Sequence, residues 1–291
     1  MMMRKNISRW EALCLLSVSL LAGMASAQSA PQQAKKKAAT KKTPPVAEAK
    51  LTLEPKALEV LKATSDRLVA AKTLSFTAVE LFEHLSRQGA PLAYTTRYEV
   101  TLKRPDKLRV LMPADGPASD FYYDGKSMMA YAPAENLLAV TDAPPTIDAA
   151  MEKAYHQAAI YFPFDDLIVA NPYSDLASGL KHAYYIGQSH VVGGTTTDML
   201  AYAGDGVFVQ IWIGVDDKLP RMVRAVYLDD PEQLRHELVF SGWKLDDAVP
   251  ADAFLPPNAV TAKRIAFAHP HPEAEQGAKS PGNGMPPKAQ Q

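Results

Sequence analysis

Hydrophobic and polar residues alternate over most of this 291-residue chain, and short turn sequences separate the alternating segments. From Leu92 to Lys103 the even-numbered residues are mainly apolar, whereas Arg97, Glu99 and Lys103 fall between them. A period of two is typical of a β-strand with one buried face. We therefore expect a mainly β fold (class α+β) built from hairpins.

The pattern predicts six strands before a helical segment and five after it, all joined by short turns, which favours an antiparallel meander. Eleven strands at about 4.8 Å spacing would form a flat sheet roughly 50 Å wide. Sheets of that width usually curl. The expected fold is an incomplete antiparallel β-barrel of about eleven strands, closed over two or three helices. The segments after the helical region are Tyr184–Val191, Thr196–Ala203, Val207–Gly214, Arg221–Leu228 and Gln233–Leu245.

The stretch Asp120–Asp142 reads as three strands joined by turns at Asp124-Gly125 and at Pro133–Asn136. Its register depends on the first loop. A three-residue loop from Asp124 to Lys126 places one set of side chains on a common face, and a two-residue loop shifts the pairing by one. Both faces are largely apolar in either case, so the meander must be covered on both sides or wrap around something apolar. The four side chains that share a face in the three-residue case are Phe121, Tyr123, Met129 and Tyr131.

Two amphipathic helices are expected to fill the curled sheet. One runs from Pro55 to Lys72, with proline near its first turn and leucines along one stripe. The other has about fourteen residues, is capped by Thr146 and carries a broad apolar stripe through Ile147, Met151 and Ile160. This second helix would serve as a plug or lid.

The N-terminus is typical of a secretory signal peptide, with basic residues, an apolar run from Ala12 to Met24 and Ala25-Ser26-Ala27. The run is too short to span a bilayer. We expect cleavage after Ala27 and a periplasmic protein. The only cysteine, Cys14, would leave with the peptide, which excludes disulfides and thiol chemistry from the exported chain. Residues 28–51 predict a flexible basic tether rich in Pro and Lys, residues 52–268 the half-barrel domain, and residues 269–291 a disordered tail.

The predicted domain carries 20 Lys and Arg against 28 Asp and Glu, a net charge near −8 that argues against nucleic acid as a partner. The spacing of His and carboxylates predicts no metal site, and no glycine motif for a phosphate cofactor is present. Ser189, His190 and Asp198 are the only imaginable hydrolytic set, but adjacent strand residues point to opposite faces. We expect no catalytic residues and no enzyme.

Six short motifs are spread over most of the predicted domain: Tyr123-Asp-Gly-Lys126, Tyr131-Ala-Pro133, Thr146-Ile-Asp-Ala-Ala150, Asn171-Pro172-Tyr173, Gln210-Ile-Trp-Ile213 and Leu219-Pro-Arg221. As a set they resemble a bacterial family of predicted periplasmic proteins, domain of unknown function 2092, over roughly residues 54–267. The family is similar to the lipoprotein-carrier (LolA/LolB-like) superfamily. That resemblance implies an incomplete barrel over helices, whose apolar interior receives acyl chains; the same fold also serves as an envelope-stress sensor module and in outer-membrane lipoprotein receptors.

Together these features favour a binding or carrier protein of the cell envelope that takes a lipid or lipoprotein acyl chain in an apolar concave cavity. An acyl chain gains about 0.8 kcal/mol per buried CH₂, so no charged or catalytic group is required. The alternative is a non-catalytic sensor or interaction module of the same fold with an envelope protein as its partner. The expected ligand-binding residues are Tyr98, Val100, Leu108, Val110, Phe121, Met129, Tyr131, Met151, Val209 and Ile211.

Overall fold

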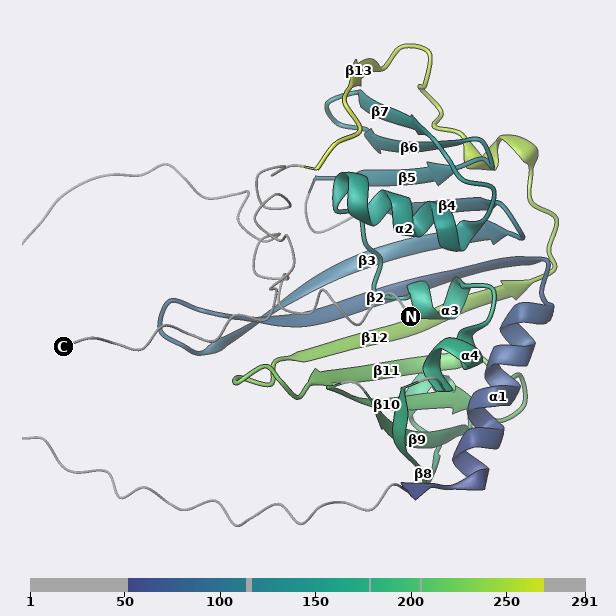
Figure 1. Ribbon diagram of the computed structural model, residues 1–291, viewed down its shortest axis with the longest axis vertical. Helices are drawn as coiled ribbons and strands as arrows, with labels where there is room; N and C mark the ends of the chain where they lie inside the picture. Colours follow the sequence, from purple (N-terminus) through teal and green to yellow (C-terminus); the bar gives the residue numbers. More distant parts are fainter. Residues whose placement is uncertain (1–51, 114–116, 178, 205, 270–291) are drawn as a thin grey trace, which may run out of the picture. The chain divides into compact units, whose positions relative to one another are not determined.

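The computed structural model describes residues 52–113, 117–177, 179–204 and 206–269. The predicted signal peptide and tether lie outside these ranges, as does the predicted tail from residue 270 onward. Their boundaries therefore remain predictions. In the described part of the chain, every strand belongs to one sheet (Figure 1).

The sheet has thirteen strands among the described residues, in the order β1-β8-β9-β10-β11-β12-β2-β3-β4-β5-β6-β7-β13. In a closed barrel the last strand of the order would pair with the first. Here the order begins with β1 and ends with β13, and these two strands do not pair, so the sheet is open. The strands are β1 (Thr52–Leu53), β2 (Thr73–Leu85), β3 (Pro91–Lys103), β4 (Lys107–Met112), β5 (Ser119–Tyr123), β6 (Ser127–Ala132), β7 (Leu137–Asp142), β8 (Leu180–Ser189), β9 (Thr197–Gly204), β10 (Val207–Gly214), β11 (Pro220–Tyr227), β12 (Arg235–Leu245) and β13 (Lys263–Ile265).

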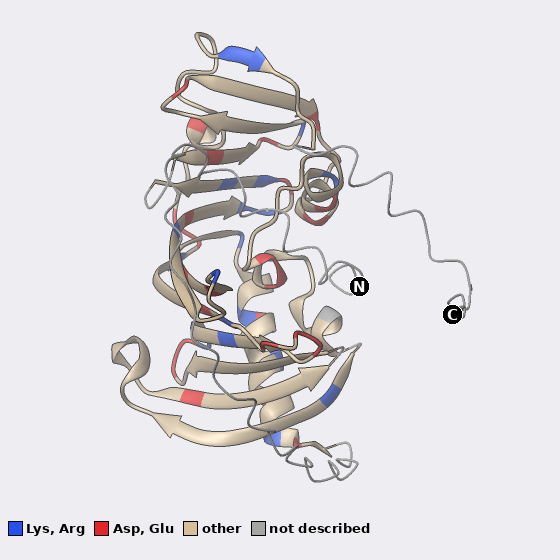
Figure 2. Cartoon of the chain, turned by 90° about the vertical axis from the view of Figure 1, so that its left-hand side faces the viewer, with Lys and Arg blue, Asp and Glu red and all other residues tan. Residues whose placement is uncertain are grey.

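The four α-helices of the described ranges lie on one face of the sheet, which we call the inner face (Figures 1 and 2). The opposite face is the outer face. Short 3-10 turns, η3 (Val192–Gly194) and η4 (Ala251–Phe254), connect strands or lead into the C-terminal segment. The helices are α1 (Pro55–Ala70), α2 (Ile147–Ala158), α3 (Asp165–Ile168) and α4 (Pro172–Ala177).

The predicted mainly β class and the open half-barrel over helices are confirmed, and the six strands before α2 and the five after α4 correspond to β2–β7 and β8–β12. The predicted strand count is too low by two. Sequence patterns missed β1 and β13, which have two and three residues and pair in parallel with β8 and β7. Strands this short show no periodicity, and both lie at the ends of the sheet.

The first turn of the central meander has two residues, but they are Gly125 and Lys126, one position beyond the predicted pair Asp124-Gly125. Tyr123 pairs with Met128, and the Asp124 carboxylate accepts hydrogen bonds from the backbone N–H groups of Lys126 and Ser127 at 2.9 and 2.7 Å. Gly125 has φ +88°, and a Cβ there would lie 2.5 Å from the Asp106 carboxylate. A glycine at this position is therefore required by both backbone conformation and space.

Helix α2 begins as predicted. The Thr146 hydroxyl accepts a hydrogen bond from the Ala149 N–H at 3.3 Å, which caps the helix. The helix ends at Ala159, whose φ of 54° lets its N–H donate to the Tyr155 carbonyl at 2.8 Å and lets the N–H of Ile160 donate to the Ala154 carbonyl at 3.2 Å. The buried stripe of α2 consists of Ile147, Ala150 and Ala154, and it turns toward the inner face.

The C-terminal segment after β12 covers the outer face of the strands β4–β7. Ala259 and Ala262 pack against Tyr122, Met129 and Tyr131. Beyond them β13 adds to the free edge of β7. The central meander is therefore covered on both faces, as its sequence demands: by α2 on the inner face and by this segment on the outer face.

Candidate functional site

The inner face of β2–β5 carries a continuous row of apolar side chains. Their alternation follows from the pairing of Val100 with Val110 and of Val110 with Phe121, which places all three on one face. These residues belong to the largest buried cluster of the described chain. Five residues of the predicted binding set are brought together here: Tyr98, Val100, Leu108, Val110 and Phe121.

Two phenylalanines from the loop between α2 and α3 fill the space above this row. Phe162 and Phe164 are stacked with their ring centroids 5.6 Å apart, and both are 1% exposed. Phe162 meets Phe121 edge-on at 5.5 Å, and Phe164 meets Tyr98 at 5.4 Å. The side chains predicted to bind an acyl chain are therefore in contact with aromatic rings of the protein itself.

Three of the five remaining predicted residues lie on α2 or elsewhere on the inner face. Met151 of α2 packs half-buried against the same cluster. Ile211 lies under α1 in a second cluster with Val60 and Leu61. Val209 is on the inner face of β10, paired with Tyr202 and Ala225.

Met129 and Tyr131 lie on the outer face, which corrects their predicted place in the concave site. The two-residue turn pairs Met129 with Tyr122 and puts Ala130 opposite Phe121. Both side chains are buried by the C-terminal segment, and the Tyr131 hydroxyl accepts a hydrogen bond from the Asn258 amide at 3.3 Å. The meander thus contributes Phe121, Tyr123, Met128 and Ala130 to the inner face.

A polar anchor fastens the α3 region to the sheet. Nη1 of Arg104, in the β3–β4 turn, donates hydrogen bonds to the carbonyl oxygens of Ile168 and Val169 at 3.0 and 3.2 Å. The Asp148 carboxylate of α2 accepts from the Ala170 N–H at 3.1 Å. Burial lowers the pKa of Arg104, and the nearby charge of Asp148 partly offsets this effect.

The sequence pattern around Arg104 does not indicate this role. Its role depends on backbone carbonyls 64 residues away in the chain, which no local pattern reveals. The one available signal was a charged residue immediately after a strand whose inner face is apolar. Such residues at strand ends can reach elements that cross the face.

Acidic and tyrosine side chains line the inner face beside the phenylalanines. The Tyr98 hydroxyl donates to the buried Glu80 carboxylate at 2.9 Å, and burial raises the pKa of Glu80. Burial and the charge of Asp166 raise the pKa of Asp165 at the start of α3. Burial, together with these carboxylates, raises the pKa of Tyr227 to about 12. The carboxylates of Glu80 and Asp165 are therefore disfavoured in their charged form.

The imagined hydrolytic set does not assemble. The Ser189 hydroxyl accepts from the Val191 N–H, and His190 Nδ1 lies 3.0 Å from the Thr196 hydroxyl. The Asp198 carboxylate accepts from the Tyr185 hydroxyl at 2.7 Å and from the Gln188 amide at 3.2 Å. Each side chain is engaged with a different neighbour.

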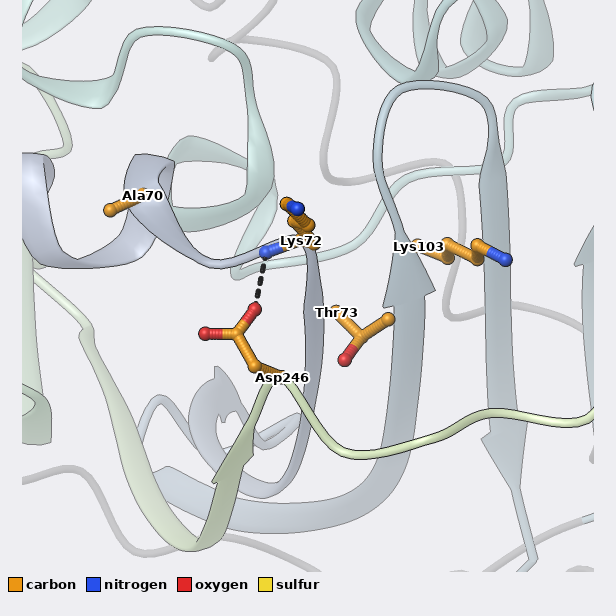
Figure 3. Close-up of a pocket in the computed structure, with 5 residues that line it drawn as sticks. All are labelled: Ala70, Lys72, Thr73, Lys103 and Asp246. Atoms are coloured by element: carbon orange, nitrogen blue, oxygen red, sulfur yellow. Dashed lines mark hydrogen bonds between the residues drawn. The ribbon is translucent and has the colours of Figure 1, made fainter.

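A surface hollow of about 560 Å³ lies where α1 meets the start of β2 (Figure 3). Asp246 accepts a hydrogen bond from the backbone N–H of Lys72 at 2.7 Å across it, and Lys103 stands on its other side. A hollow with this polar lining does not suit a hydrocarbon chain.

Within the described ranges, no helix has both the length and the apolar character needed to cross a bilayer. Among the same residues, no three His, Cys, Asp or Glu side chains are grouped as metal ligands would be.

Several solved structures resemble this chain at low identity. LprF from Mycobacterium bovis shares 13% identity with a TM-score of 0.44, over 71% of this chain and 99% of that one. The MucA/MucB complex from Pseudomonas aeruginosa shares 15% with a TM-score of 0.42, over 72% and 64%. A LolA superfamily protein from Nitrosomonas europaea shares 12% with a TM-score of 0.31, over 69% and 97%. Because these TM-scores are below 0.5, no property of those proteins is carried over.

No protein with a curated description matches the chain in sequence. A family model does match, over residues 57–268, which is nearly the whole of the described part. The chain belongs to this family, described as predicted periplasmic protein (DUF2092).

Proposed function

We propose that this protein is a non-catalytic periplasmic carrier, exported with cleavage after Ala27, that binds the acyl chain of a lipid or lipoprotein on its inner face. The observation that carries the proposal is the position of Phe162 and Phe164. These rings cover an apolar sheet face from a loop, not from a regular element. A loop can withdraw its side chains without breaking the sheet beneath them.

The exchange of the two rings for an acyl chain favours binding. Fully burying a phenylalanine side chain gains about 1.5–3 kcal/mol, so two rings supply roughly 3–6 kcal/mol. A chain of some fourteen methylenes supplies about 11 kcal/mol before the costs of binding. A ligand of this size could displace the rings and still bind with a favourable free energy.

The polar anchor limits how far the cover can move. Arg104 and Asp148 hold residues 168–170 against the sheet through backbone groups. The loop bearing Phe162 and Phe164 lies between this anchor and the end of α2. Motion of this loop, with α2 and the anchor fixed, is the expected route of entry.

The test is uptake of a fluorescent fatty acid by delipidated protein. We expect saturable binding with one site, competition by unlabelled fatty acid or a diacylated lipopeptide, and a blue shift of probe emission. Absence of saturable uptake of either ligand class would refute the carrier function. Mass spectrometry of material co-purified from the periplasm then identifies the natural ligand.

A second candidate, a protein-interaction module, is favoured by the outer face. Paired residues of five neighbouring strands form one apolar row there, and two adjacent members, Val239 and Val79, are 44% and 38% exposed. The row consists of Met199, Trp212, Met222, Val239 and Val79. If this row docks an envelope protein, Val239→Lys abolishes its recovery in a pull-down and leaves fatty-acid uptake unchanged.

A further inference from the structure

The C-terminal residues 263–269 pass from the edge of the sheet to its inner face. Ile265 of β13 pairs with Ala139 of β7. Two residues later, Phe267 is 7% exposed and belongs to the same buried cluster as Phe121 and Phe162. We call residues 263–269 the C-terminal strap.

Small residues are frequent in the buried cluster to which Phe267 belongs. The sheet contributes alanines where other strands of the inner face carry large side chains, and the buried stripe of α2 is also rich in alanine. An aromatic ring fits between two such surfaces, whereas facing leucines would exclude it. The alanines of this cluster are Ala130 and Ala139 from the sheet and Ala150, Ala154 and Ala158 from α2.

One side chain of α2 marks the position of the strap. The Gln157 amide nitrogen donates to the carbonyl oxygen of Phe267 at 3.1 Å, and its amide oxygen lies 3.4 Å from the Thr141 hydroxyl of β7. Gln157 thus links helix, sheet and strap. The ring of Phe267 is held at the end of the acyl-binding face that lies beneath α2.

The attachment of the strap is weak compared with that of the rest of the sheet. β13 has three residues, all exposed, and Ile265 is 48% exposed. Besides the Gln157 bond, its polar contacts include a hydrogen bond from the Lys263 N–H to the Asn136 carbonyl at 2.9 Å, and the Asn136 amide donates to the Thr261 carbonyl just before the strap at 3.2 Å. Short edge strands with few buried apolar contacts open at low free-energy cost.

We propose that the C-terminal strap is an internal competitor for the acyl-binding face: Phe267 occupies the slot beneath α2 that receives the end of a bound acyl chain. This proposal rests on the proposed carrier function and specifies its regulation. Ligand entry then requires β13 to separate from β7 and Phe267 to leave the slot. Release of ligand is favoured by return of the ring.

The first test replaces Phe267 and measures affinity for a fluorescent fatty acid. Phe267→Ala empties the slot and removes the competitor, so we expect binding at least 10-fold tighter than in the unaltered protein. Ile265→Ala is the matched control, because it shortens an exposed apolar side chain of the same strap and should leave affinity within about two-fold.

The second test fixes the strap and does not depend on the stability of Phe267→Ala. Residues paired across two neighbouring strands are close enough for a disulfide bond. Because Ile265 pairs with Ala139, the double variant Ala139→Cys, Ile265→Cys can form one. The pair is made with Cys14→Ser so that no other thiol is present. Oxidation should reduce probe uptake at least 10-fold, and a reductant should restore it.

The outcomes separate the two proposals. If the unaltered protein binds the probe, but neither Phe267→Ala nor the oxidised cysteine pair changes its affinity, the strap is only a structural clamp and the inference is wrong. If neither the unaltered protein nor the reduced cysteine pair nor Phe267→Ala binds any acyl probe, the carrier function itself is wrong.

Discussion

Arg104 Nη1 donates a hydrogen bond to the backbone carbonyl oxygen of Ile168 at 3.0 Å, which joins the β3–β4 turn to the end of α3. The Nε and Nη2 atoms of the same guanidinium are buried and have no hydrogen-bond partner among the described residues. Such unpaired donors cost free energy. Nη1 is therefore the atom through which this arginine holds the end of α3.

Arg104→Ala should loosen the α3 region. Loss of the charged donor to two carbonyls removes on the order of 2 kcal/mol from the local free energy of opening. We expect amide hydrogen exchange of residues 165–170 to accelerate about 10-fold or more, and fatty-acid uptake to become faster. Arg87→Ala, at the exposed tip of the β2–β3 hairpin, is the control that should change neither.

Gly125→Ala tests the turn that sets the register of the central meander. The new Cβ would lie 2.5 Å from Asp106 Oδ2, and the backbone has φ +88°. Gly89 has a similar φ of +80°, but a Cβ added there would meet no atom of the described residues within 4 Å, so Gly89→Ala reports the backbone strain alone. In urea unfolding we expect about 1 kcal/mol of destabilisation for Gly89→Ala and clearly more for Gly125→Ala. Equal losses would show that the Asp106 contact is unimportant.

Much of the fold could be predicted because the sheet strands alternate cleanly. β3 shows apolar residues at every inner position from Tyr98 to Leu102, and Thr146 caps α2 as its sequence requires. The register of the meander could not be predicted. A three-residue loop from Asp124 to Lys126 and a two-residue loop are both compatible with the sequence, and the choice decides whether Met129 or Ala130 shares the face of Phe121.

The candidate site was only half predictable for the same physical reason. Inner-face residues such as Val110 follow from alternation, but the rings that cover them belong to Phe162 and Phe164, in a loop without periodicity. Phe267 stands at the end of the predicted domain, where no pattern indicates a role for it. A side chain that reaches the core from an irregular segment is fixed by tertiary contacts, which a local pattern does not contain.

The buried Glu80 predicts that stability falls as the pH rises. Burial raises the folded-state pKa of Glu80 above its ordinary value of 4.5, so the folded protein binds more protons than the unfolded chain in the range above that value. The slope of the unfolding free energy with pH is then negative there. Glu80→Gln keeps a partner for the Tyr98 hydroxyl and removes the charge.

Urea unfolding at pH 5 and pH 8 measures this effect. We expect Glu80→Gln to be more stable than the unaltered protein at pH 8, with a smaller difference at pH 5. The raised pKa of Asp165 also makes stability fall as the pH rises, so the pH dependence of the Glu80 variant is reduced but not abolished. Glu59→Gln, at a solvent-exposed position on α1, should leave the profile unchanged. A profile for Glu80→Gln parallel to that of the unaltered protein would contradict this assignment.

Phe162→Ala tests whether Phe162 is a fixed core residue or a ring that occupies the space of a bound ligand. Removing a phenylalanine that is 1% exposed costs about 3–5 kcal/mol in the absence of ligand, because a cavity remains. If the acyl chain enters the same space, fatty acid fills the cavity and recovers part of the loss. A ligand at 100 times its Kd stabilises by about 2.7 kcal/mol. The thermal shift on adding fatty acid should therefore be larger for Phe162→Ala than for the unaltered protein.

Phe208→Ala is the control for this experiment, since Phe208 lies on the outer face of β10, opposite Ala203 and Val226. Its replacement should lower the melting temperature less and leave the thermal shift by fatty acid unchanged. If Phe162→Ala and Phe208→Ala gain equally from the ligand, the acyl chain does not occupy the space of Phe162. Binding would then have to occur elsewhere on the molecule, and the loop after α2 would be a fixed part of the core.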